Sequence, residues 1–265
     1  MKTLLVIVAL SFAFFKHEEP KLVWVKEHEI NVKPKAWGVD PLGNIIYADK
    51  EVIYKLDTSF SVQFKQSIKE FGEITHIDAS HAQKSLVFSE DQQQIFFLDN
   101  TLTLTTNGLD LADEGIGYAT HVSYSNQPTR YWVYDYDNFK LWLFDDLKNK
   151  PSVIENLNGV LNGLHVDKLF EAENTLFIWD KSKGVFLFDV YGSLIKKYEI
   201  KGADALTYFD GSFYYLKKGK LYKSLKGGGE MNLDFPEENV KELHMEEQDF
   251  YLQTDNKIIK YSLKK

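Results

Sequence analysis

The stretch Val133–Asp145 (VYDYDNFKLWLFD) contains two short, largely apolar runs joined by a polar turn. Runs of this kind are typical of two β-strands in a hairpin. The same pattern occurs six times, in copies that begin at residues 46, 87, 133, 177, 214 and 251. The copies are Ile46–Asp57, Val87–Asp99, Val133–Asp145, Phe177–Asp189, Tyr214–Leu225 and Tyr251–Leu263. A repeat of about 40 residues with about four short strands is typical of a propeller blade. The sequence therefore predicts an all-β, six-bladed β-propeller.

The two ends of the repeat array complement each other. Each hairpin follows another short β segment and most precede a fourth, so we expect strands a, b, c and d from the centre of a blade outward. The last copy ends at Leu263, directly after its strand c, whereas Leu22–Val32 is a spare β segment ahead of the first blade. Placing that segment as strand d of the last blade would close the ring and remove an open sheet edge. An open β-sandwich of several hairpins is the alternative.

The N-terminal residues have the composition of a signal peptide. A charged start at Lys2 precedes an apolar run, and the small residues Ser11 and Ala13 are spaced for cleavage. We expect a signal peptide at 1–13, a polar spacer at 14–21 and a single propeller domain at 22–265. An uncleaved anchor is the alternative, although the run is shorter than the roughly 20 residues that span a bilayer.

The composition limits the cellular compartments and the classes of partner that fit this chain. The chain has no cysteine, a formal net charge of −8 and a single arginine, Arg130. Disulfides and a thiol nucleophile are therefore excluded, and an acidic chain without a basic cluster is a poor nucleic-acid binder. We expect a soluble protein of the periplasm, or a secreted one, without stable membrane insertion once the signal is removed.

The repeated pattern resembles a known class of propellers. Alternating apolar residues, a turn aspartate and a closing Phe-Asp pair are similar to blades of the six-bladed NHL-like and TolB-like propellers, and to uncharacterised secreted propellers of flavobacterium-type bacteria. The resemblance covers residues 22–265 and implies the fold, but it includes no functional signature. The fifth and sixth copies depart from it, with Leu225 and Leu263 in place of the closing Asp.

Four of the seven histidines share one register in the expected innermost strands. They are His76, His121, His165 and His244, and acidic residues follow two positions later at Asp78, Asp167 and Glu246. One interpretation is a structural ring in which each imidazole makes the same hydrogen bond between neighbouring blades. The other is a divalent metal site, as in the metal-dependent lactonases that share six-bladed architecture. Repetition favours the structural role, because a packing solution is copied with its blade. We therefore predict no metal and no cofactor.

The loop Thr106–Gly117 makes the longest step between two copies, and we predict that it binds a partner. Its apolar residues would be costly to leave in water, and its acidic residues would form a polar rim. The residues concerned are Leu109, Asp110, Leu111, Asp113, Glu114 and Ile116. The alternative is that the loop folds back and buries its own leucines on the disc.

The sequence contains no G-x-S-x-G, H-E-x-x-H or Walker-type motif, and no catalytic residue is assigned. The main prediction is a non-enzymatic periplasmic propeller that acts as a scaffold for another protein of the cell envelope. One concrete version is an accessory or plug subunit of an outer-membrane or secretion assembly, as in type IX secretion. The alternatives are a metal-dependent, lactonase-like hydrolase that uses the channel histidines and carboxylates, and a carbohydrate-binding module.

Overall fold

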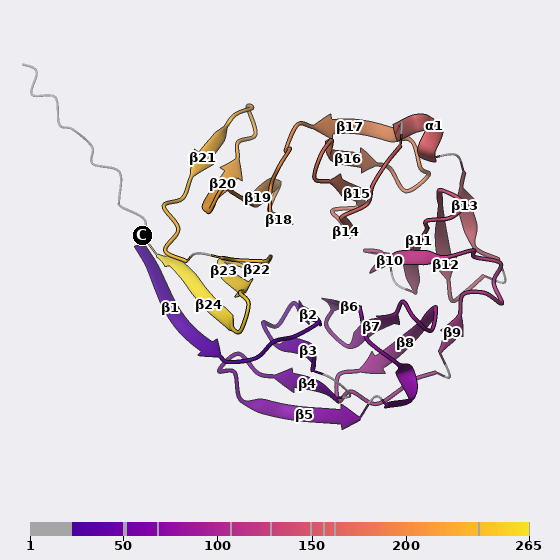
Figure 1. Ribbon diagram of the computed structural model, residues 1–265, viewed down its shortest axis with the longest axis horizontal. Helices are drawn as coiled ribbons and strands as arrows, with labels where there is room; N and C mark the ends of the chain where they lie inside the picture. The colour runs from indigo at the N-terminus through magenta and orange to yellow at the C-terminus, as the bar shows by residue number, and fades with distance from the viewer. Residues whose placement is uncertain are drawn as a thin grey trace, which may run out of the picture.

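The computed structural model describes most of the chain downstream of the predicted N-terminal signal. The described residues are 23–49, 52–67, 69–106, 108–127, 129–148, 150–155, 157–161, 163–237 and 239–264. The predicted signal peptide and spacer lie outside them. Within them, six antiparallel sheets of four strands each are arranged around a central axis (Figure 1). The predicted six-bladed β-propeller is confirmed.

The first three blades follow the chain in order, each starting with its innermost strand. Blade 1 consists of β2 (Ala36–Val39), β3 (Ile45–Asp49), β4 (Val52–Leu56) and β5 (Val62–Ser67). Blade 2 consists of β6 (His76–His81), β7 (Lys84–Ser89), β8 (Gln94–Asp99) and β9 (Leu109–Asp110). Blade 3 consists of β10 (Ala119–Tyr124), β11 (Arg130–Asp135), β12 (Lys140–Asp145) and β13 (Ser152–Ile154).

The remaining blades repeat the arrangement, except that the last takes its outermost strand from the other end of the chain. Blade 4 consists of β14 (Lys168–Ala172), β15 (Thr175–Asp180), β16 (Gly184–Phe188) and β17 (Leu194–Tyr198). Blade 5 consists of β18 (Ala205–Phe209), β19 (Ser212–Lys217), β20 (Lys220–Ser224) and β21 (Glu230–Asn232). Blade 6 consists of β22 (Glu242–Glu246), β23 (Asp249–Gln253), β24 (Ile258–Lys264) and β1 (Val23–Ile30).

Strand β1 closes the ring, as predicted. It pairs antiparallel with β24 from Val23 opposite Lys264 to Ile30 opposite Ile258, with an irregularity between Lys26 and His28. Trp24 fixes its position, because its indole Nε1 donates a 2.8 Å hydrogen bond to the Leu233 carbonyl of the neighbouring blade. The edge that β24 would otherwise expose is therefore covered.

The core lies between the blades. Within the described residues, six hydrophobic clusters each join the facing sides of two neighbouring sheets. Trp132 of blade 3, for example, packs in one cluster with Leu176 and Phe186 of blade 4. Large aromatic side chains suit such flat interfaces because each ring covers much area with few rotatable bonds. The blades are therefore held together mainly by apolar contact.

The aspartate that closes four of the repeats caps the turn between strands c and d. Asp57 accepts hydrogen bonds from the backbone N–H groups of the residues two and four positions later, at 2.9 and 3.0 Å. Asp99 and Asp189 do the same. Asp145 accepts from the residue two positions later, at 3.1 Å. The conserved geometry explains why the repeat ends in Asp in blades 1 to 4.

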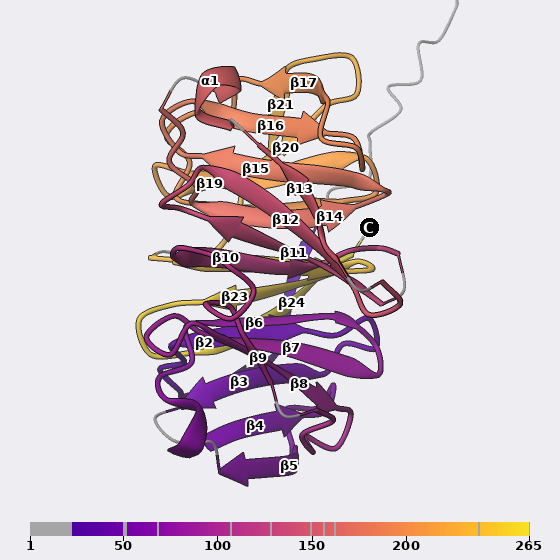
Figure 2. The same ribbon diagram turned by 90° about the vertical axis from the view of Figure 1, so that its right-hand side faces the viewer.

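Helical structure is minor in the described part of the chain. It consists of a 3-10 turn, η1 (Lys69–Phe71), and a short helix, α1 (Leu157–Leu161), at the outer side of blade 4 (Figure 1). No described helix has the length and apolarity needed to cross a membrane. A side view shows the strands running across the thickness of the disc (Figure 2).

Candidate functional site: the central channel

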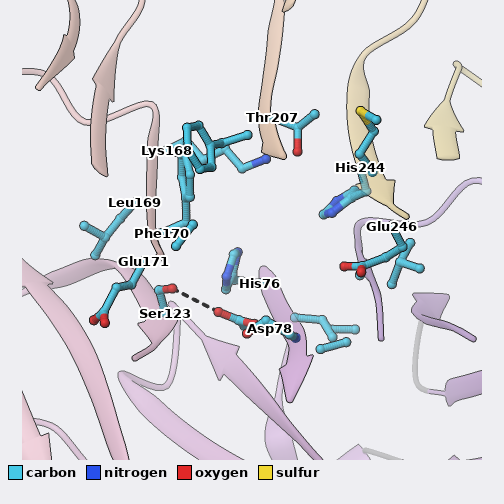
Figure 3. A pocket seen from close by; sticks show the side chains of 18 residues that line it. His76, Asp78, Ser123, Lys168, Leu169, Phe170, Glu171, Thr207, His244 and Glu246 are labelled. Carbon is cyan, nitrogen blue, oxygen red and sulfur yellow. Dashed lines mark hydrogen bonds between the residues drawn. The ribbon is translucent and has the colours of Figure 1, made fainter. Parts of the chain in front are cut away.

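The six innermost strands surround two adjoining chambers. The wide chamber has a volume of about 540 Å³ and reaches the turns between strands b and c. The narrow chamber has a volume of about 200 Å³ and lies at the other end of the innermost strands (Figure 3). All innermost strands run in the same direction, so early residues such as Glu242 face the wide chamber and later ones such as Glu246 face the narrow one.

Five residues line both chambers and form the boundary between them. They are His76 and Ile77 of blade 2, Lys168 and Leu169 of blade 4, and His244 of blade 6. Figure 3 shows the Lys168 amine and the two imidazoles pointing toward the middle of the channel. Lys168 Nζ also donates a 3.0 Å hydrogen bond to the Leu206 carbonyl of blade 5. The polar groups at the boundary are therefore one amine and two imidazoles.

Burial determines the protonation of the imidazoles. It lowers the pKa of His76 and of His244, and lowers that of His121 to about 3. These rings are therefore neutral at pH 7. Burial also lowers the pKa of the Lys168 amine, while the carboxylates of Glu242 and Asp78 act in the opposite direction.

Carboxylates in the channel wall connect neighbouring blades. Asp78 accepts hydrogen bonds from Ser123 Oγ at 3.0 Å and from the Tyr124 N–H at 2.8 Å (Figure 3). Glu171 accepts one from Trp132 Nε1 at 2.6 Å. Glu242 accepts one from Trp37 Nε1, which joins blade 6 to blade 1.

The predicted histidine register holds for three of its four members. His76, His121 and His244 lie on innermost strands in the channel wall. His165 lies three residues before β14, and its side chain is 74% exposed beside Asp167, with His165 Nδ1 3.5 Å from Asp167 Oδ2. The residue that occupies the inner position of blade 4 is Lys168, which the sequence analysis did not identify.

The histidines do not all make the same hydrogen bond. His121 contacts Thr120 Oγ1 at 2.9 Å through Nδ1 and also bonds to the backbone of Asp167 in blade 4. His244 packs edge-on against the Trp37 ring, with centroids 4.4 Å apart, and its Nε2 has no hydrogen-bond partner. The carboxylates described above make most of the polar contacts between innermost strands.

The predicted partner-binding loop is largely part of the core. Leu111 and Ile116 are buried between blades 2 and 3, and Leu109 packs partly against the same cluster. Asp110 caps the turn by accepting from the Ala112 N–H at 3.0 Å. The loop has thus folded back on the disc and covered its large apolar side chains, and two acidic residues remain exposed at its tip. They are Asp113 and Glu114.

The residues that the structure describes include no group of three or more His, Cys, Asp and Glu side chains placed to hold a metal ion. In the wide chamber, His76 and His244 are accompanied by the Lys168 amine. The metal-dependent alternative thus has no donor set among these residues.

The fold and the channel define the protein as a six-bladed β-propeller with a polar, two-chambered axis. No protein-family model and no curated protein matches the sequence. Among solved structures, virginiamycin B lyase from Staphylococcus aureus aligns with a TM-score of 0.63 at 8% identity, covering 92% of this chain and 100% of the lyase.

Two further structures come from proteins with other activities. The Neurospora crassa Pan2 WD40 domain aligns with a TM-score of 0.62 at 8% identity, covering 94% of this chain and 98% of that domain. A chain of the mitotic checkpoint complex aligns with a TM-score of 0.63 at 10% identity, over 100% of both chains. At these identities the similarity concerns the fold alone, which occurs in a lyase, in a WD40 domain and in a chain of a protein complex.

Proposed function

We propose that this propeller is a non-enzymatic scaffold that binds another protein of the cell envelope through the rim of blades 3 and 4. The composition of residues 1–13 supports a periplasmic location. An accessory role in an outer-membrane or secretion assembly is the form of this function that the location favours. The propeller neighbours found in protein complexes are consistent with a protein partner.

One observation carries the proposal, namely a difference between equivalent turns. Two positions after the capping aspartate, blades 1 and 2 have Ser59 and Thr101, whose hydroxyls donate to that aspartate at 2.6 and 2.7 Å. Blades 3 and 4 have Leu147 and Tyr191 at the same position, with exposed fractions of 82% and 87%. Neither large side chain is needed to form its turn, because the hydrogen bond to the capping aspartate comes from the backbone N–H of Leu147 or Tyr191.

A groove between the same two turns continues this surface. It has a volume of about 290 Å³, and its walls include Leu143, Val190 and Tyr191 together with Arg130 and Lys148. Burying an exposed leucine or tyrosine against a partner contributes about 1.5–3 kcal/mol, and tyrosine and arginine are frequent at the centres of protein interfaces. The rim therefore offers the exposed Leu147 and Tyr191 side chains at a groove whose walls are partly apolar and partly polar.

Site-specific photocrosslinking tests the proposal. A photoreactive amino acid at position 147 or 191, introduced into the protein in its native cells, should give a discrete adduct with one envelope protein. The matched controls carry it at positions 59 and 101, the same turn position in blades 1 and 2, and should give none.

The double variant Leu147→Ser/Tyr191→Ser should lose the complex while retaining its melting temperature, because both side chains are exposed. Equal crosslinking at all four turn positions, or an unchanged complex in the double variant, would contradict an interface at this rim.

A further inference from the structure

Several residues in the wall of the wide chamber carry buried polar atoms without a partner. In the described part of the chain, six buried side-chain atoms have no hydrogen-bond partner, and three of them belong to residues that line this chamber. They are Tyr134 Oη, Trp179 Nε1 and His244 Nε2, from blades 3, 4 and 6. Tyr134 and Trp179 are only 1% and 3% exposed. Leaving a buried polar group without a partner costs about 1–3 kcal/mol, so the clustering of three at one cavity points to a ligand.

The unpartnered groups are mainly donors. An indole N–H can only donate, and a phenol can donate. Lys168 adds an amine, which donates one hydrogen bond to the Leu206 carbonyl. The chamber wall therefore includes buried donors that no described residue accepts from, together with the Lys168 amine.

The acceptors of the chamber are mostly engaged already. Of the four carboxylates in its wall, Glu90 accepts from the Tyr118 hydroxyl, Asp167 from the Lys181 N–H and Glu242 from the Trp37 indole. A ligand that fits must therefore supply acceptors, and a negative charge would suit the Lys168 amine, which shares the chamber wall with Lys181 and Lys241. Such an anion would favour the protonated form of Lys168, as Glu242 and Asp78 do.

We propose that the wide chamber binds a small organic anion through a carboxylate group, with Lys168 as its charge partner and Trp179 and Tyr134 as hydrogen-bond donors. The volume of about 540 Å³ is within the range of small-molecule sites. The aromatic faces of Trp37, Tyr134 and Trp179 would contact the carbon skeleton of the ligand. This site is separate from the rim of blades 3 and 4, so the two proposals stand or fall independently.

Calorimetric titration with succinate and with acetate, at constant ionic strength, tests the site. One saturable site is expected for at least one of the two anions, and none for D-glucose, which lacks a charge. Trp179→Phe and Tyr134→Phe each remove one donor and retain the ring, and each should weaken binding about three- to tenfold. Lys168→Met should abolish it.

The chain provides matched controls. Trp142 Nε1 and Tyr124 Oη are also buried without a partner, but neither residue lines the wide chamber. Trp142→Phe and Tyr124→Phe should therefore leave the affinity unchanged, as should Lys65→Met on the exposed strand β5. If Lys168→Met does not fold, the two conservative variants decide the question.

Three outcomes would overturn the proposal. The first is no saturable heat with either anion, as expected for a chamber that holds only water. The second is equal weakening by the chamber variants and their controls. The third is binding of D-glucose in place of the anions, which would make the chamber a carbohydrate site.

Discussion

Trp132 Nε1 donates a 2.6 Å hydrogen bond to Glu171 Oε2 across the boundary between blades 3 and 4. Both side chains are buried, with exposed fractions of 0% and 8%. The bond therefore satisfies a carboxylate that water does not reach freely. Trp142 of blade 3 offers a natural comparison, since its indole N–H is also buried but has no partner.

Trp132→Phe should reduce the free energy of unfolding by about 2–3 kcal/mol, because it leaves a buried carboxylate oxygen unpaired. Trp142→Phe should be close to neutral, since it removes a donor that has nothing to donate to. Urea unfolding followed by circular dichroism measures both. Similar losses in the two variants would mean that ring volume, and not the hydrogen bond, determines the effect.

Ring closure depends on Trp24, whose ring packs edge-on against Phe235 and Phe250 at 4.9 and 4.8 Å. We expect Trp24→Ala to cost about 3–5 kcal/mol and to promote aggregation through the exposed edge of β24. Val23→Ala, on the same strand but 52% exposed, should change stability by less than about 0.5 kcal/mol. Light scattering during thermal unfolding would reveal the difference, and a Trp24→Ala variant as stable and monomeric as Val23→Ala would refute this role.

The two histidines that sequence alignment treats as equivalent should behave differently. His121→Ala removes hydrogen bonds to Thr120 and to the backbone of Asp167, with an expected loss of about 1–3 kcal/mol. His165→Ala changes a largely exposed side chain and should stay within about 0.5 kcal/mol of the wild type. The denaturant midpoints of the two variants measure this difference. Equal losses of stability would support the predicted ring of four equivalent histidines.

The loop at 106–117 should prove structural. Leu111→Ala is expected to cost about 2–5 kcal/mol, because the side chain is fully buried. Glu114→Ala at the exposed tip should leave the melting temperature nearly unchanged. A stable Leu111→Ala protein would show that the leucine contributes little to the core.

Glu246 should make stability decrease as pH rises from about 4.5 to about 7. Burial in the narrow chamber, with Asp40 nearby, raises the pKa of Glu246 from 4.5 to about 7. Between these two values the folded protein binds more protons than the unfolded chain, so the free energy of unfolding falls with rising pH. Glu246→Gln should remove this dependence and stabilise the protein at pH 8 by about 1–2 kcal/mol, after allowance for solvent screening. At pH 4 the two proteins should be equally stable, and a pH-independent difference would disprove the raised pKa.

Hydrophobic periodicity was sufficient to predict most of the fold. Alternation in Val133–Asp145 and its copies identifies strands b and c of every blade, and the spare segment at 22–32 identifies the closing strand. These features are local in sequence or follow from counting strands. The turn-capping role of the closing aspartate is also local in sequence, because its side chain accepts hydrogen bonds from backbone N–H groups within the next four residues.

The site was harder to predict, because the register of an innermost strand depends on its turn. His165-Val166-Asp167 has the same pattern as His76-Ile77-Asp78, yet β14 begins only at Lys168. The hairpin turn at Glu173 and Asn174, with φ values of 50° and 57°, sets the pairing of Ala172 with Thr175. Counting back from that turn would have placed Lys168 in the channel. The burial of the loop leucines depends on contacts with the next blade, which no local pattern encodes.

Closure by β1 also has a kinetic consequence. Glu29 of this strand and its partner Lys257 are 228 residues apart along the chain, although they form an ion pair at 3.1 Å. During synthesis β1 leaves the ribosome early, and its hydrogen-bonding partner emerges only after the other five blades. Blades 1 to 5 are built from consecutive segments and can form as they appear, whereas blade 6 requires the largest loop closure in the molecule. The nascent chain therefore carries β1 without its partner until β24 has been synthesised, and the ring can close only after that point.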